Sequence, residues 1–132
     1  MDDFQITKEI EVCWGDLDAV QHVNNLIYLR WVETARVEYF MKLNNERLQN
    51  DDNIGPVVAS QDCKHIRPVN FPDSTIVGVK REEILDDRIV LKTKIFSKKQ
   101  NRLVAISPQH IVSYDYKRRI KSPLPLNWVY NN

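Results

Sequence analysis

The segment "LIYLRWVETARVEYFMKLNNE" at residues 26–46 decides the fold, because its apolar residues recur with the period of an α-helix. At 100° per residue, one arc of this helix collects the side chains of Tyr28, Leu29, Trp31, Val32, Ala35, Tyr39 and Leu43. The opposite arc carries the more polar residues Arg30, Glu33, Thr34 and Glu38. A helix with such a wide apolar face must bury that face against other elements.

Asparagine pairs flank this helix on both sides. Asn24 or Asn25 can cap its N-terminus, because an Asn side chain accepts a hydrogen bond from a free backbone N–H group of the first turn. Asn44 and Asn45 suit its C-terminal end. We therefore expect one long amphipathic helix between the two pairs.

Segments typical of β-strands precede and follow the helix. Residues 4–14, "FQITKEIEVCW", alternate apolar and polar side chains, which predicts a half-buried strand. Four runs rich in Val, Ile and Thr follow, at residues 54–69, 74–84, 88–98 and 102–116. Short turns separate them, which favours an antiparallel meander. Pro108 lies inside the last run and removes a hydrogen-bond donor, so we expect a bulge or an edge there.

The order strand, helix, four strands predicts an α+β fold with one helix lying across one sheet. Five strands could wrap around the helix, and the other face of the sheet would need a partner, so we expect a dimer or a larger assembly. The proline-rich segment 122–132 does not suit a central strand. A chain of 132 residues is the size of one ordinary domain, and we expect residues 1–132 to form it.

Composition excludes several classes of function. The net charge of +1 gives no reason to expect binding to nucleic acid or to a membrane surface. The acidic N-terminal stretch lacks an apolar core, so we expect no signal peptide and a cytoplasmic protein with reduced thiols at Cys13 and Cys63. The motifs Gly-x-Ser-x-Gly, GxGxxG, the P-loop and H-E-x-x-H are absent from the sequence.

The stretch "GDLDAVQHVNNLIY" at residues 15–28 contains the densest group of polar side chains. It is either a polar turn that leads into the helix or an active site. Asp16, Asp18 and His22 are too few to complete a metal site on one short loop, so we expect no metal. His65 and His110 lie in expected strands, where a histidine is more often structural or exposed than catalytic.

Residues 14–40, "WGDLDAVQHVNNLIYLRWVETARVEYF", resemble the opening of the 4-hydroxybenzoyl-CoA thioesterase family of hotdog-fold acyl-CoA thioesterases. The family pattern reads approximately D-x-D-x-x-G-H-V-N-N-x-x-Y, followed by an aromatic-rich helix with E-x-A-R. The matching residues are Asp16, Asp18, His22, Val23, Asn24, Asn25, Tyr28, Glu33, Ala35 and Arg36. Later, Pro68, Asp73 and the segment "KSPLP" at 121–125 fit further parts of the pattern.

The resemblance implies a hotdog fold, in which a curved antiparallel sheet of five strands wraps around one long helix. It also implies hydrolysis of an acyl-CoA thioester without a further cofactor, by homodimers with interfacial active sites that often pair into homotetramers. By motif position, Asp18 takes the role of the catalytic carboxylate and the backbone N–H of Asn25 that of the donor that polarises the carbonyl. His22 and Tyr28 would line the site, and Asn24 would fix the loop or cap the helix.

Two residues near the motif have structural interpretations. Asp16 is expected to brace the loop rather than react. Arg36 lies toward the apolar arc of the helix, where an unpaired charge is costly, so we expect an ion pair with Glu33 or another buried acid.

Two departures from the family pattern leave alternatives open. Gln21 stands where the family has a Gly, a residue that can supply a positive φ. One alternative is therefore a hotdog protein that binds acyl or aromatic ligands without catalysis. Pro72 replaces a second common Gly. The turn "ILDDR" at 84–88 is acidic where some relatives have basic residues for the coenzyme A nucleotide, so a thioesterase for acyl carrier protein is another alternative.

Overall fold

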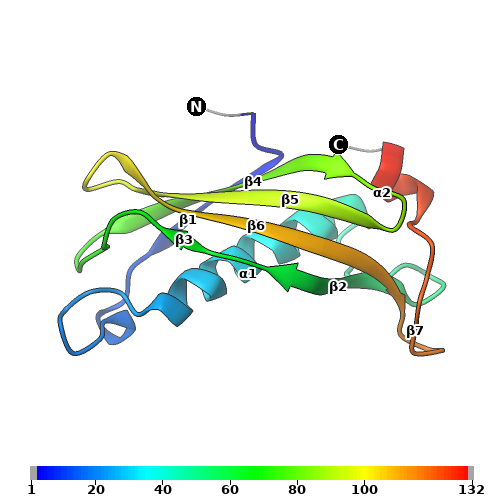
Figure 1. Cartoon of the computed structure of the whole chain (residues 1–132), viewed down its shortest axis with the longest axis horizontal. Helices are drawn as coiled ribbons and strands as arrows, with labels where there is room; N and C mark the ends of the chain where they lie inside the picture. The colour runs from blue at the N-terminus through cyan, green and yellow to red at the C-terminus, as the bar shows by residue number, and fades with distance from the viewer. Residues whose placement is uncertain (1–2, 131–132) are drawn as a thin grey trace.

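The structure is a computed structural model that describes residues 3–130. Within this range a long helix lies along one face of a curved antiparallel sheet (Figure 1). The elements are β1 (Ile6–Glu11), the 3-10 helix η1 (Trp14–Asp16), α1 (Asn25–Leu43), β2 (Ile54–Gln61), β3 (Lys64–His65), β4 (Ser74–Ile84), β5 (Arg88–Ser97), β6 (Arg102–Asp115), β7 (Ile120–Lys121) and α2 (Leu126–Tyr130). This arrangement is the hotdog fold and confirms the predicted fold class.

The sheet of the described chain has seven strands, in the order β1-β4-β5-β6-β2, with β3 and β7 also paired to β6. All pairings are antiparallel. The sequence predicted five strands. The number rises because the expected run 54–69 is broken into β2 and β3, and because β7 adds a short extra pairing.

Pro108 lies in β6, in the middle of the sheet. On one side it aligns with Lys92 of β5. On the other side the pairing of β2 ends at Gln61 and that of β3 begins at Lys64, so Pro108 faces the break between them. The missing N–H of Pro108 therefore costs no hydrogen bond of the ladder, and the predicted edge takes the form of a local gap in the neighbouring strand.

One face of α1 is buried against the sheet, as the periodicity predicted. The buried residues are Tyr28, Trp31, Val32, Ala35, Tyr39, Phe40 and Leu43. Asn24 is the N-cap, and its side-chain oxygen accepts a hydrogen bond from the N–H of Leu26 at 3.0 Å. Asn44 is the C-cap, and its N–H donates to the carbonyl of Phe40. Both asparagine pairs therefore mark the helix ends that the sequence indicated.

The short helix α2 covers the C-terminal end of α1. Trp128 is fully buried, and its ring lies 5.0 Å from that of Phe40, centroid to centroid. Its indole N–H donates to Asn44 Oδ1 at 3.0 Å, and the side chain of Asn127 donates to the carbonyl of Leu43 at 2.9 Å. This contact explains why Phe40, which lies outside the predicted apolar arc, is buried. Neither helix of the described chain has the length and apolar character that crossing a membrane requires.

We expect the substitution Trp128→Ala to lower the free energy of unfolding by about 3–5 kcal/mol, because it leaves a cavity beside Phe40 and removes one of the two hydrogen bonds that Asn44 Oδ1 accepts. Chemical denaturation measures this change. The matched control is Leu126→Ala in the same short helix, where the side chain is 73% exposed and the change should stay within about 0.5 kcal/mol. Equal losses in the two variants would contradict the role given to Trp128.

Candidate active site

The loop between β1 and α1 is held together by Asp16. Its Oδ2 accepts a hydrogen bond from the N–H of Cys13 at 2.8 Å, and its backbone carbonyl accepts one from the N–H of Asn24 at 2.9 Å. These bonds fasten the beginning of the loop to its end, immediately before α1. Asp16 therefore braces the loop, as expected from the sequence.

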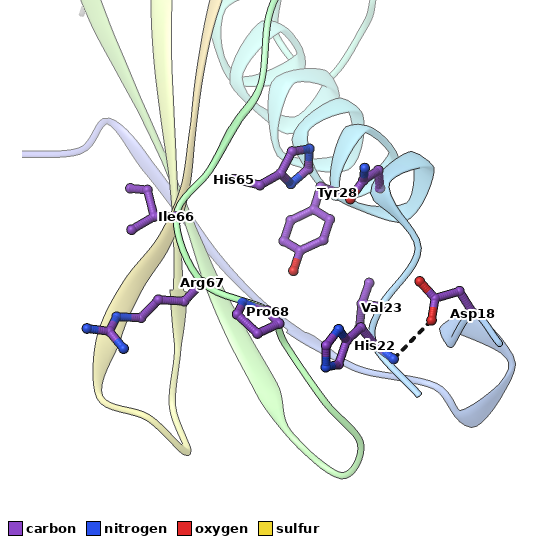
Figure 2. A pocket seen from close by; sticks show the side chains of 9 residues that line it. Asp18, His22, Val23, Tyr28, His65, Ile66, Arg67 and Pro68 are labelled. Atoms are coloured by element: carbon purple, nitrogen blue, oxygen red, sulfur yellow. Dashed lines mark hydrogen bonds between the residues drawn. The ribbon is translucent and has the colours of Figure 1, made fainter. Parts of the chain in front are cut away.

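Asp18 organises the tip of the same loop. Its Oδ1 accepts hydrogen bonds from the backbone N–H groups of Val20 at 2.9 Å and His22 at 3.2 Å, and the second bond is drawn in Figure 2. Its own N–H donates to the carbonyl of His22 at 2.7 Å. The other carboxylate oxygen, Oδ2, has no hydrogen-bond partner among residues 3–130. One oxygen thus shapes the loop while the other is free to act on a bound molecule.

Gln21 has a backbone φ of +65°, in the left-handed region. The structure therefore requires at this position the conformation that the family's Gly adopts without strain. The N–H of Gln21 donates to the carbonyl of Asp18 at 3.1 Å, which closes the turn. Gln21 holds this left-handed conformation at a cost in backbone strain that a Gly would not have.

The N-terminus of α1 supplies an unused donor next to this loop. Asn25 is the first residue of the helix, where a backbone N–H has no acceptor within the helix. In the described part of the chain this N–H makes no other hydrogen bond. The positive end of the helix dipole adds to its attraction for negative charge.

These groups meet in a cleft of about 250 Å³ at the N-terminal end of α1 (Figure 2). The cleft is lined by Asp18, His22, Val23, Asn25, Tyr28, His65, Ile66, Arg67 and Pro68. Four of the five residues singled out from the sequence are brought together here. The fifth, Asn24, caps the helix and is not part of the lining.

The opposite wall of the cleft comes from β3 and the residues after it. The ring of His65 contacts that of Tyr28 edge to face, with 4.7 Å between centroids and 83° between planes. Burial raises the pKa of the Tyr28 phenol, so this side chain stays neutral near pH 7. His65 was expected to be structural or exposed, and its place in the cleft was not predicted, because it depends on the pairing of β3 with β6, where His65 lies opposite Ala105.

Among residues 3–130, Arg36 does not form the ion pair with Glu33 or another acid that was expected from the sequence. Its Nη1 donates to Gln109 Oε1 at 3.0 Å and lies 3.4 Å from Gln61 Oε1. Gln109 is fully buried and donates in turn to Thr93 Oγ1 at 2.7 Å. Burial lowers the pKa of Arg36. The negative charge of Glu33 raises this pKa, although the two side chains form no ion pair within residues 3–130. Amide oxygens thus solvate this guanidinium in place of a carboxylate.

Comparison with known protein families identifies the family of this chain. The family model of the thioesterase-like superfamily matches residues 12–132, and the chain belongs to this family. Within residues 3–130, no cluster of three or more His, Cys, Asp or Glu side chains could hold a metal ion.

Solved structures support the same assignment. A thioesterase candidate from Pseudomonas aeruginosa is 25% identical, with a TM-score of 0.85 over 96% of this chain and 97% of that protein. A thioesterase from Thermus thermophilus, complexed with coenzyme A and zinc, is also 25% identical, with a TM-score of 0.79 over 93% of each chain. The uncharacterized protein YsmA of Bacillus subtilis (strain 168) is 27% identical over 88 residues. That match covers 67% of this chain and only 58% of YsmA.

Replacing Gln21 by Gly should raise the free energy of unfolding by about 0.5–1 kcal/mol, because Gly adopts the observed positive φ without a clash of Cβ. Thermal or chemical unfolding measures the gain. Gln21→Ala keeps Cβ and is the matched control, for which we expect no stabilisation. A gain of equal size with Ala would show that the side chain of Gln21, and not its backbone conformation, is unfavourable.

Proposed function

We propose that this protein hydrolyses an acyl-CoA thioester to a free acid and coenzyme A, with Asp18 as general base or nucleophile. The observation that carries the proposal is that one cleft is lined both by Asp18, whose Oδ2 has no partner among residues 3–130, and by Asn25, whose backbone N–H is free in the same range. Membership of the thioesterase-like superfamily supports the reaction class. The Thermus thermophilus relative complexed with coenzyme A supports the choice of thiol.

A thioester requires little from an enzyme beyond these two groups. Its leaving thiolate belongs to a thiol with a pKa of about 8.5, if it behaves like cysteine, so it departs near neutral pH without a strong acid. A carboxylate can activate water or attack the carbonyl directly. A backbone N–H at a helix N-terminus can stabilise the negative charge that develops on the carbonyl oxygen.

Each residue of the cleft receives a role in this proposal. Asp18 acts through Oδ2, since Oδ1 holds the loop. The N–H of Asn25 polarises the thioester carbonyl, and Asn24 fixes the start of the helix. His22 and Tyr28 contact the substrate. The proposed mechanism uses no metal and no cofactor, since Asp18 and the N–H of Asn25 carry its steps and coenzyme A enters as part of the substrate.

We further propose that the protein works in the cytoplasm as a homodimer that pairs into a homotetramer, in the manner of the 4-hydroxybenzoyl-CoA thioesterase family. A thioesterase for acyl carrier protein is the second candidate, because the turn between β4 and β5 is acidic. There Asp87 accepts hydrogen bonds from Arg88 and Lys121, which hold the pKa of its carboxyl well below the usual range. Arg88, the one basic residue of the stretch 84–88, is therefore engaged with Asp87, as is Lys121 of β7.

The substitution Asp18→Asn should lower kcat/KM for the best acyl-CoA substrate by at least about 100-fold, because an amide cannot serve as base or nucleophile. The melting temperature should change little, since the Asn oxygen can still accept the bonds from Val20 and His22. Steady-state hydrolysis across short, long and aromatic acyl-CoAs, together with thermal unfolding, gives both readouts.

Asp16→Asn is the matched control, because it removes a carboxylate of the same loop that braces the backbone. It should retain most of the activity. Wild-type turnover by the Asp18→Asn protein would remove Asp18 from the mechanism. Faster hydrolysis of an acyl carrier protein thioester than of the matched acyl-CoA would favour the second candidate, and no hydrolysis of either would favour a non-catalytic binding protein.

A further inference from the structure

Arg36 carries a positive charge that the proposed mechanism does not use. It lies on α1 roughly two turns after Tyr28, which places it about 12 Å further along the helix axis than that residue of the cleft. Its side chain is partly buried, and no carboxylate within residues 3–130 pairs with it. A buried cation is costly unless its charge is compensated, so the surroundings of Arg36 require an explanation.

Two amide side chains hold the guanidinium of Arg36 in one orientation. Its Nη1 lies 3.0 Å from Oε1 of Gln109 and 3.4 Å from Oε1 of Gln61. Gln109 is itself fixed, since it is fully buried and its Nε2 donates to Thr93 Oγ1 at 2.7 Å and to the carbonyl of Ser107 at 3.1 Å. These amide oxygens orient the guanidinium, but they do not compensate its charge.

The other two nitrogens of Arg36 are available to a ligand. Within residues 3–130, Nε and Nη2 form no hydrogen bond and no ion pair. Their N–H groups lie on the same side of the planar guanidinium, where they form a fork that a carboxylate can bind with both of its oxygens. The side of the guanidinium that suits a carboxylate is therefore the side without a partner in the described chain.

A cavity of about 140 Å³ adjoins Arg36 between α1 and β2, which run side by side in Figure 1. We call it the Arg36 cavity. Its walls come from α1, the loop that follows α1, β2 and β6, and its apolar lining residues are Val37, Phe40, Leu48, Pro56, Val58 and Ile111. It shares no lining residue with the cleft at Asp18. The Arg36 cavity thus combines one cation with mostly apolar walls.

Glu33 is the one acidic residue of the lining, and it does not neutralise Arg36. Its side chain is exposed and forms no ion pair in the part of the chain that the structure describes. Burial lowers the pKa of Arg36 and the charge of Glu33 raises it, burial being the larger effect. Water weakens the field of an exposed carboxylate, so the guanidinium decides which ligands the Arg36 cavity attracts.

We propose that the Arg36 cavity binds a small organic acid, with the carboxylate on Nε and Nη2 of Arg36 and a short apolar chain against the walls. The inference does not depend on the proposed thioesterase function, because the cavity and the cleft have separate linings. Apolar walls favour such an acid over an inorganic anion, which would lose its hydration there without gaining an apolar contact. The volume limits the chain to a few carbon atoms.

The first test is a titration with pentanoate at constant pH and ionic strength, followed by NMR through the Nε–H signal of Arg36 and the backbone signals of α1 and β2. Wild type should bind pentanoate with a Kd on the order of 1 mM, as suits so small a ligand. Pentanamide has a similar shape without the charge and should bind at least about tenfold more weakly.

Two results of this titration would overturn the inference. One is equal affinity for pentanoate and pentanamide, which would show that the charge of Arg36 plays no part. The other is no binding of pentanoate by wild type, which is the result expected if an acidic side chain of a second copy of the chain pairs with Arg36 instead.

The second test compares variants. Arg36→Gln should weaken pentanoate binding at least about tenfold, because an amide cannot replace the charged fork. Arg30→Gln is the matched control, since it removes an exposed cation from the same helix, and it should bind as wild type does. Equal losses in these two variants would overturn the role given to Arg36.

A third variant fills the Arg36 cavity and leaves the guanidinium in place. Leu48 lies on the loop after α1 and is 43% exposed, so Leu48→Trp can enlarge the side chain at the wall without disturbing the core. It should also weaken pentanoate binding at least about tenfold, while its melting temperature stays close to that of wild type. Undiminished binding by folded Arg36→Gln and Leu48→Trp proteins would place the ligand elsewhere and overturn the inference.

Discussion

The apolar face of α1 is the constraint on which the rest of the structure depends. A helix of 19 residues is about 28 Å long, and most of that length must be covered on one side. The strands β4 and β6 have 11 and 14 residues, which correspond to roughly 36 and 46 Å of extended chain. Such strands are long enough to follow the whole helix. The curvature of the sheet then closes it around the helix from β1 on one side to β2 on the other.

The position of the cleft follows from this packing. Because the buried face fixes the axis and rotation of α1, the free N–H of Asn25 is held at one end of the sheet. The loop from Cys13 to Asn24 is short and is fastened at both ends by Asp16, so Asp18 has little freedom relative to the helix. The break between β2 and β3 brings His65 over Tyr28. Rigid elements on three sides therefore define the space in which the proposed chemistry takes place.

The features that the sequence predicted well are those that depend on nearby residues. Helix periodicity, the caps at Asn24 and Asn44 and the strand runs are local properties, and the structure has them where the sequence indicated. The loop motif brought Asp18, His22, Asn25 and Tyr28 together because they lie within eleven residues of one another. Their roles in catalysis stay a prediction.

The features that the sequence did not predict depend on contacts between distant segments. Arg36 bonds to Gln109, 73 residues away, and nothing in the periodicity of either segment indicates that pairing. The burial of Phe40 depends on Trp128, and the place of His65 depends on the register of β3 against β6. In each case the deciding information is the alignment of two strands or the docking of a remote helix, which no local pattern contains.

The docking of α2 on the end of α1 has a consequence for the order in which the molecule can fold. The strands of the main path end at Asp115, so the sheet can close on α1 before α2 has docked. The ring of Phe40 and the polar groups of Asn44 stay uncovered until residues 126–130 reach their place. A folding intermediate with a closed sheet and an undocked α2 would therefore expose an apolar site at the end of the helix, the kind of surface from which aggregation starts.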